Sequence, residues 1–117
     1  MIRYKLGDVV LLPFPFTDFS TFKQRPALVI SSTRFNWTHG DVIVAAISSH
    51  IMASSDKNDY RIPQSDQISA GLPRPSIVKL GKIVTIDQRL IRKRLGALST
   101  KTTSLLLARV VKIFSTT

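Results

Sequence analysis

The sequence predicts a mainly β domain with helices (α+β), in which short strands form a small barrel or twisted sheet covered by one C-terminal helix. Short apolar segments rich in Val and Ile alternate with polar segments that contain Pro, Gly, Asp and Ser. The hydrophobic period then becomes helical near the C-terminus. The chain of 117 residues suffices for one core, and no linker or repeat divides it, so we expect a single domain over residues 1–117.

Three strands are expected in the first half. Residues 8–14 form the first, which the prolines at positions 13 and 15 end. Residues 17–24 are predicted as a polar loop, because no periodicity survives there. The continuous apolar run 27–31 is typical of a strand buried on both faces. A loop or short turn at 33–40 then precedes the third strand, Asp41–Ser48.

Shorter strands follow. The segment 51–59 is polar and expected to be mobile, and residues 60–62 can add a short strand. A strand over 76–80 is broken or bulged by Gly81 and continues over 82–86. A last strand is expected at 94–98.

A helix is expected at the C-terminus, with Ser99 or Thr100 as its cap. Its apolar stripe consists of Leu105, Leu106, Val110, Ile113 and Phe114. Leu107 and Val111 fall outside this stripe and widen the apolar surface. A second copy of the chain would cover the surplus, so we expect a homodimer.

Charge is the strongest compositional signal. Seventeen Lys and Arg oppose seven acidic residues, all of them Asp, and the formal net charge is +10. Such an imbalance predicts an anionic partner, most often nucleic acid, with an acidic protein as the alternative. A membrane surface is not expected as a partner, because the basic residues do not line one face of a long amphipathic helix.

Several classes of protein are excluded. The chain has no cysteine, which rules out disulfides, thiolate metal sites and cysteine nucleophiles. No apolar run approaches the roughly 20 residues that span a bilayer. The N-terminal residues contain no apolar core of a signal peptide, so a cytoplasmic protein is expected.

Polar side chains gather at the ends of two expected strands. Arg25 stands before Pro26, where the loop meets the second strand, and Ser48, Ser49 and His50 end the third. A guanidinium and a hydroxyl–imidazole pair so placed can converge on a phosphate. Alternation along an extended chain would put residues 48 and 50 on the same side. A solvated Arg and a loop-closing Ser remain the alternatives.

Short motifs follow one another along the chain: Gly-Asp-Val-Val at 7–10, Phe-Pro-Phe-Thr-Asp at 14–18, Arg-Pro-Ala-Leu-Val at 25–29, Ala-Ala-Ile-Ser at 45–48, Gly-Leu-Pro-Arg-Pro-Ser at 71–76 and Thr-Ile-Asp at 85–87. In this order and at this spacing, the series resembles the MazF/PemK/Kid family of toxin–antitoxin toxins, over residues 7–114.

This resemblance implies an SH3-like barrel of the MazF/CcdB type that acts as a homodimeric mRNA interferase. Such an enzyme cuts single-stranded RNA at a short sequence, uses neither metal nor other cofactor, and leaves a 2′,3′-cyclic phosphate. An acidic antitoxin protein blocks its RNA groove.

The resemblance also assigns catalytic roles. Arg25 matches the family's catalytic arginine, which binds phosphate and can act as the acid. Ser48 stands where relatives carry Thr or Ser, and His50 where many carry Gln. Relatives commonly have an acidic residue at the position of Gly81, and this chain has no Glu to replace it. Either His50 or Asp18 then serves as the base, or the protein binds RNA without cutting it.

RNA contacts are expected from residues around these positions: Asp18, Lys23, Gln24, Ser49, Arg74, Lys79 and Lys82. Between residues 71 and 96, seven cations oppose only Asp87, and such a run can track a phosphate backbone or form a solvated face. Rings in or beside polar loops can stack on bases or anchor a minor core: Phe16, Phe19, Phe22, Phe35 and Trp37. For Phe14 and Phe16, a core position is at least as well supported. The runner-up function is a non-catalytic binding module on the same fold, such as a toxin that poisons DNA gyrase.

Overall fold

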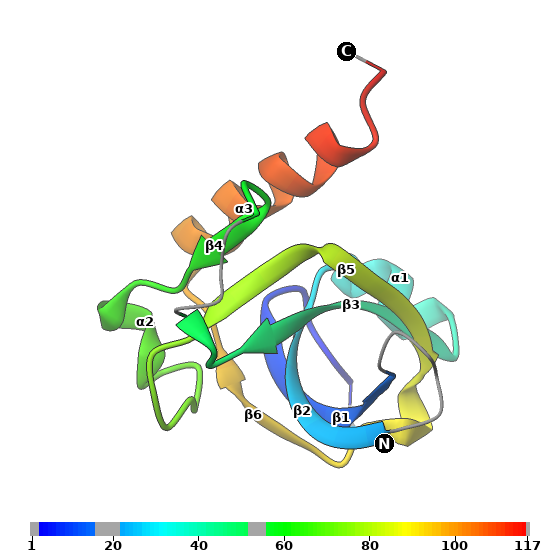
Figure 1. Cartoon of the computed structure of the whole chain (residues 1–117). Coiled ribbons are helices and arrows are strands. Elements are labelled where there is room, and N and C mark those ends of the chain that lie inside the picture. Colours follow the sequence, from blue (N-terminus) through cyan, green and yellow to red (C-terminus); the bar gives the residue numbers. More distant parts are fainter. Residues whose placement is uncertain (1–2, 16–21, 52–55, 117) are drawn as a thin grey trace.

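Six antiparallel strands form one strongly bent sheet in the computed structural model, which describes residues 3–15, 22–51 and 56–116 (Figure 1). The strand order in the sheet is β4-β5-β3-β2-β1-β6. The strands are β1 (Asp8–Pro15), β2 (Phe22–Val29), β3 (Asp41–Ser48), β4 (Asp59–Arg61), β5 (Ile77–Asp87) and β6 (Lys93–Ala97). The helices are α1 (Thr33–Thr38), α2 (Gln64–Gln67) and α3 (Thr100–Ile113), with a 3-10 turn, η2, at Gln88–Leu90.

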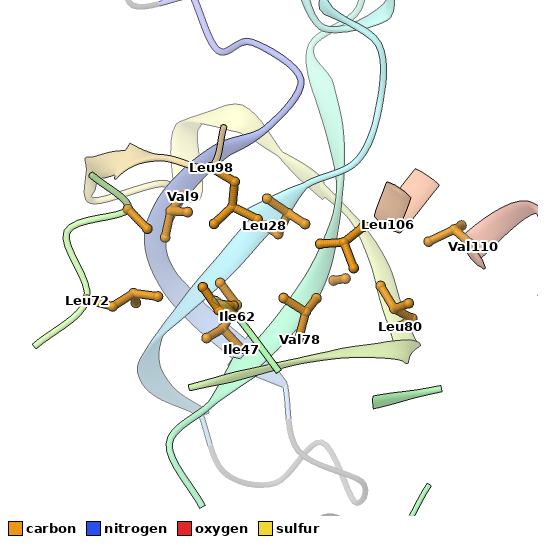
Figure 2. Close-up of a cluster of buried hydrophobic side chains, with 12 residues drawn as sticks. Val9, Leu28, Ile47, Ile62, Leu72, Val78, Leu80, Leu98, Leu106 and Val110 are labelled. Carbon is orange, nitrogen blue, oxygen red and sulfur yellow. The ribbon is translucent and has the colours of Figure 1, made fainter. Parts of the chain in front are cut away.

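Each face of the sheet buries its own apolar cluster, because side chains alternate along every strand. The α3-side cluster consists of Val9, Leu28, Ala45, Ile47, Ile62, Ala70, Leu72, Val78, Leu80, Leu98, Leu106 and Val110. Figure 2 shows this cluster, to which α3 contributes the last two residues. The far-side cluster consists of Tyr4, Val10, Leu12, Phe14, Ala27, Val29, Val42, Val44, Ala46, Ile86 and Ile91.

The expected interruption of the strand at Gly81 is confirmed as a bulge in β5. Ala45 of β3 pairs with Ile83, whereas the next residue, Ala46, pairs with Lys79, so residues 80–82 are extra in the ladder. A Cβ added to Gly81 would meet no atom within 4 Å. The bulge bends β5, and its first part pairs with β3 on one edge and with β4 on the other.

The second strand starts earlier than the sequence indicates. Residues 22–24 belong to β2 rather than to a loop, and Lys23 and Gln24 pair with Phe14 and Pro13 of β1. The prediction of a loop was wrong here, because the hydrogen-bond partners that β1 supplies outweigh the weak strand propensity of polar residues.

One short helix replaces an expected loop, and a second lies where no element was expected. The segment expected to be a loop or turn at 33–40 contains α1, whose first turn is capped by the Ser32 hydroxyl as it accepts from the Phe35 N–H at 3.0 Å. The helix α2 was not expected. The expected turn residue His39 is the C-cap of α1.

The C-terminal helix begins as expected. The Ser99 hydroxyl caps it by accepting from the Thr102 N–H at 3.2 Å. Leu106 and Val110 pack in the α3-side cluster and Ile113 lies against it. Leu105 and Phe114, expected on the same stripe, are exposed, because the buried arc of the helix is narrower than the apolar one. Within the described residues no helix is both long and apolar enough to span a membrane.

Candidate functional site

Arg25 lies inside a strand and not at the point where a loop meets one. It is the fourth residue of β2 and stands directly opposite Leu12 of β1. Opposite residues of an antiparallel pair project to the same face. Since Leu12 belongs to the far-side cluster, Arg25 carries its guanidinium on that face, where the side chain is half-buried and Nε is buried.

Ser48 is related to Arg25 by the register of β2 and β3. The ladder pairs Ala27 with Ala46, and side-chain alternation along each strand puts Arg25 and Ser48, two residues beyond that pair, on the same face as these alanines. Among the described residues the ladder ends at Ala27 and Ala46, although β2 continues beside β1 and β3 beside β5. The Arg25 guanidinium and the Ser48 hydroxyl thus lie on the same face, just beyond the point where the β2–β3 pairing ends.

His50 does not continue the strand alternation from Ser48. The strand β3 ends at Ser48, whose Oγ accepts from the backbone N–H of His50 at 3.1 Å. The expectation that alternation aligns the two side chains was therefore wrong, because the chain turns at Ser49. Ser49 and His50 are both exposed. The Ser48 hydroxyl keeps its own proton for donation, since a serine oxygen can accept and donate at once.

Lys79 joins this face from β5. It stands opposite Ala46 on one side and opposite Asp59 of β4 on the other. Its Nζ lies 3.2 Å from Asp59 Oδ2, with the Lys79 side chain 27% exposed and that of Asp59 6% exposed. Asp59 was not expected here, because it lies in the segment 51–59 that was predicted to be mobile. The alternation of polar and apolar residues at 59–62 is the signal that could have extended the strand to it.

The other expected RNA-binding residues lie on several elements. Lys23 and Gln24 are exposed on β2, Ser49 follows β3, and Arg74 and Lys82 are exposed before and within β5. Asp18 lies outside the described residues.

The run of cations between residues 71 and 96 meets more carboxylates than its own segment contains. Arg89 Nη2 lies 2.8 Å from Asp87 Oδ2, and hydrogen bonds from Arg89 lower the pKa of Asp87 to about 2. Arg94 Nε lies 3.0 Å from Oδ1 of buried Asp8, and Lys79 pairs with Asp59. Asp87 is the one acidic residue within the segment, and sheet pairing brings further acidic residues from β1 and β4 beside these cations.

The aromatic residues of α1 are held within the fold. Phe35 stacks on the His39 ring at 4.1 Å between centroids. Trp37 is 45% exposed, but its Nε1 donates to the Tyr4 carbonyl at 3.2 Å, and the Arg3 guanidinium lies 5.0 Å from its ring centroid. These contacts favour the anchoring role over base stacking for both rings.

Of the four other aromatic residues singled out in the sequence, the structure describes the side chain of one. Phe14 is buried in the far-side cluster, as expected. Phe16 and Phe19, and the side chain of Phe22, lie outside what the structure describes. No group of three or more His, Cys, Asp or Glu side chains able to hold a metal occurs in residues 3–15, 22–51 and 56–116.

A family model described as a PemK-like, MazF-like toxin of a type II toxin–antitoxin system matches residues 5–114. No curated protein matches the chain.

Solved structures with this fold include an endoribonuclease from a mycobacterial species (16% identity, 97% of this chain and 93% of that one, TM-score 0.76). MazF from Deinococcus radiodurans is similar as well (20% identity, 97% and 98% covered, TM-score 0.76). A MazE–MazF complex from the same organism matches over 100% of both chains (19% identity, TM-score 0.74). At these identities the likeness concerns the fold, and it confirms the expected small barrel with a C-terminal helix.

Proposed function

Because the chain belongs to the PemK-like, MazF-like toxins of type II toxin–antitoxin systems, we propose that it is a sequence-selective endoribonuclease that cuts single-stranded RNA without a metal. The observation that carries this proposal is the alternation of side chains along β2, β3 and β5, which puts Arg25, Ser48 and Lys79 on one face beyond the last β2–β3 pair, Ala27 and Ala46. The net charge of +10 supports an RNA substrate. Solved structures of this fold whose names include "endoribonuclease" support the activity.

The reaction we propose is a transfer within the RNA. The 2′-oxygen bonds to the adjacent phosphorus, the bond from phosphorus to the 5′-oxygen breaks, and a 2′,3′-cyclic phosphate and a 5′-hydroxyl result. The phosphorane carries extra negative charge, which donors already in place stabilise best. Arg25 offers a planar set of N–H donors that can bind two phosphate oxygens. The Ser48 hydroxyl can donate a hydrogen bond to a further oxygen of the same phosphate.

His50 is our candidate for the base that takes the proton of the 2′-hydroxyl. Its imidazole is exposed. Its backbone N–H donates to Ser48 Oγ, and this hydrogen bond keeps the His50 backbone next to Ser48, which we assign to the phosphate site. Imidazoles exchange protons near neutral pH. Arg25 is also the candidate acid for the leaving 5′-oxygen.

The test of this proposal is cleavage of a long defined RNA in EDTA, with primer extension to locate the ends. Arg25→Ala should lower the cleavage rate by about a hundredfold or more, the usual effect of removing one fixed donor to an oxyanion. Arg34→Ala is the matched control, since it removes an exposed guanidinium from α1. Intact RNA with excess wild-type protein, across varied sequences, would refute the activity.

We also propose that an acidic antitoxin covers this surface and that two copies of the chain form a dimer. One solved structure of the same fold is an endoribonuclease in complex with its cognate antitoxin (15% identity, 97% of each chain, TM-score 0.77). Charge complementarity to a chain of net charge +10 supports an acidic partner. If the proposal holds, adding the antitoxin should stop cleavage.

One observation favours the alternative of a module that binds without cutting. Gly81, where relatives commonly carry an acidic residue, faces open space and offers no side chain to take a proton. Salt-dependent RNA binding without any cyclic-phosphate product would establish this alternative.

A further inference from the structure

Asp59 is an almost buried carboxylate that the proposed reaction does not use. Its side chain is 6% exposed, and its Oδ2 lies 3.2 Å from Lys79 Nζ. Burying a carboxylate is costly unless a charged or hydrogen-bonding partner meets it, so the partner bears on what Asp59 does.

The backbone around Asp59 is held in place. Its N–H donates to the Asp56 carbonyl at 3.0 Å, and the Asn58 N–H donates to Asp56 Oδ1 at 2.8 Å. The Asn58 carbonyl then accepts from the Leu80 N–H at 3.0 Å, which fastens this turn to the bulge of β5. These hydrogen bonds fix the backbone from which the Asp59 carboxylate projects, on the strand next to that of Lys79.

The sheet register relates the Asp59–Lys79 pair to the proposed phosphate site. Asp59, Lys79 and Ala46 are opposite one another on β4, β5 and β3. Ser48 follows Ala46 by two residues on the same face, so Lys79 and Ser48 are diagonal neighbours. Diagonal neighbours on a sheet lie about 7–8 Å apart, which long side chains can span.

An ammonium on a four-carbon stem is a flexible point charge with three donors. The bond to Asp59 uses one donor and restricts the stem, and two donors remain for phosphate oxygens. Without the carboxylate, Lys79 would have to be ordered each time RNA binds.

We propose that Asp59 is a positioning residue, which holds the Lys79 ammonium against the phosphate that Arg25 and Ser48 bind. This inference rests on the proposed function and adds a residue of β4 to its site. Asp59 acts through Lys79 and takes no proton from the RNA.

The test is a double-mutant cycle with Asp59→Asn and Lys79→Met, measured as single-turnover cleavage. Asp59→Asn should slow cleavage about tenfold, within the range of directly coupled pairs. In the Lys79→Met background it should cause no further loss. Asp87→Asn is the matched control, because it removes a carboxylate from another ion pair and should leave the rate unchanged.

An equal loss in both backgrounds would overturn the proposal, as would no loss in either. Removal of the acidic limb of the pH–rate profile by Asp59→Asn would also overturn it, because that result makes Asp59 the base. Thermal unfolding checks each variant. If Asp59→Asn does not fold, Asp59→Glu takes its place, with a smaller loss that should again vanish in the Lys79→Met background.

The same cycle on binding separates this inference from the proposed function. The probe is an RNA with a 2′-deoxy sugar at the cut site, which binds but cannot be cut. If the wild-type protein cuts no RNA, the activity fails, but Asp59→Asn should still weaken binding of this probe only when Lys79 is present. Equal weakening with and without Lys79 would contradict the positioning role.

Discussion

At the scale of single residues, chemistry depends on which face of the sheet a side chain occupies. Arg25 is half-buried beside Leu12, and a charge in such a place interacts with a phosphate more strongly than one in water. His50 differs, because it lies past the end of β3 and is exposed. The proposed phosphate-binding group, Arg25, is thus half-buried, whereas the proposed base, His50, is exposed to solvent.

The role of His50 predicts a specific loss of activity. His50→Gln should slow cleavage by about a hundredfold, the lower end for loss of a general base. Single-turnover rates of the variant and the wild-type protein on one RNA provide the check. A variant that cuts as fast as the wild-type protein would exclude His50 as the base.

At the scale of elements, the bulge in β5 determines which neighbouring strands the residues on either side of it pair with. The three extra residues at 80–82 bend β5, so that Lys79 lies between β3 and β4 while Ile83 continues along β3. Gly81 is at the centre of the bulge, and its surroundings leave room for a side chain. A side chain at position 81 would therefore meet no steric barrier from the surrounding atoms.

This geometry predicts that Gly81→Asp is tolerated and gains activity. The new Cβ meets no atom within 4 Å, so the melting temperature should change little. A carboxylate there adds a second candidate base near Lys79, and we expect cleavage to rise severalfold. Gly81→Ala is the control for the change in backbone freedom. A slower enzyme with an unchanged melting temperature would show that a carboxylate at 81 is harmful in this chain.

At the scale of the whole molecule, the apolar residues of α3 exceed what one sheet face can cover. Val111 is 68% exposed and Phe114 is 72% exposed, although Leu106 and Val110 of the same helix are buried. Exposed apolar residues that lie together on one element are typical of a protein–protein interface. The surplus supports the proposed dimer.

The dimer predicts that Phe114→Asp shifts the protein towards the monomer in sedimentation velocity, because burying a carboxylate at an apolar interface is unfavourable. Phe114→Leu should keep the dimer, since it preserves an apolar side chain. A wild-type protein that sediments as a monomer at all concentrations would contradict the proposed assembly.

Local patterns were enough to predict much of this molecule. Apolar runs located β1 and β3, Gly81 located the bulge of β5, and Ser99 located the start of α3. Each of these depends on residues that are near one another in the chain. The family resemblance pointed to the same fold, which the structural neighbours confirm.

Only the tertiary structure decided which distant residues meet. Pairing with β1 made a strand of residues 22–24, and the turn after Ser48 separated His50 from the strand alternation. Sheet pairing brought Asp59 to Lys79 and put Arg25 and Ser48 on one face, two residues beyond the last β2–β3 pair. The physical reason is that ladder hydrogen bonds and ion pairs form between segments whose separation in sequence carries no local signal, so their partners are set when the sheet assembles.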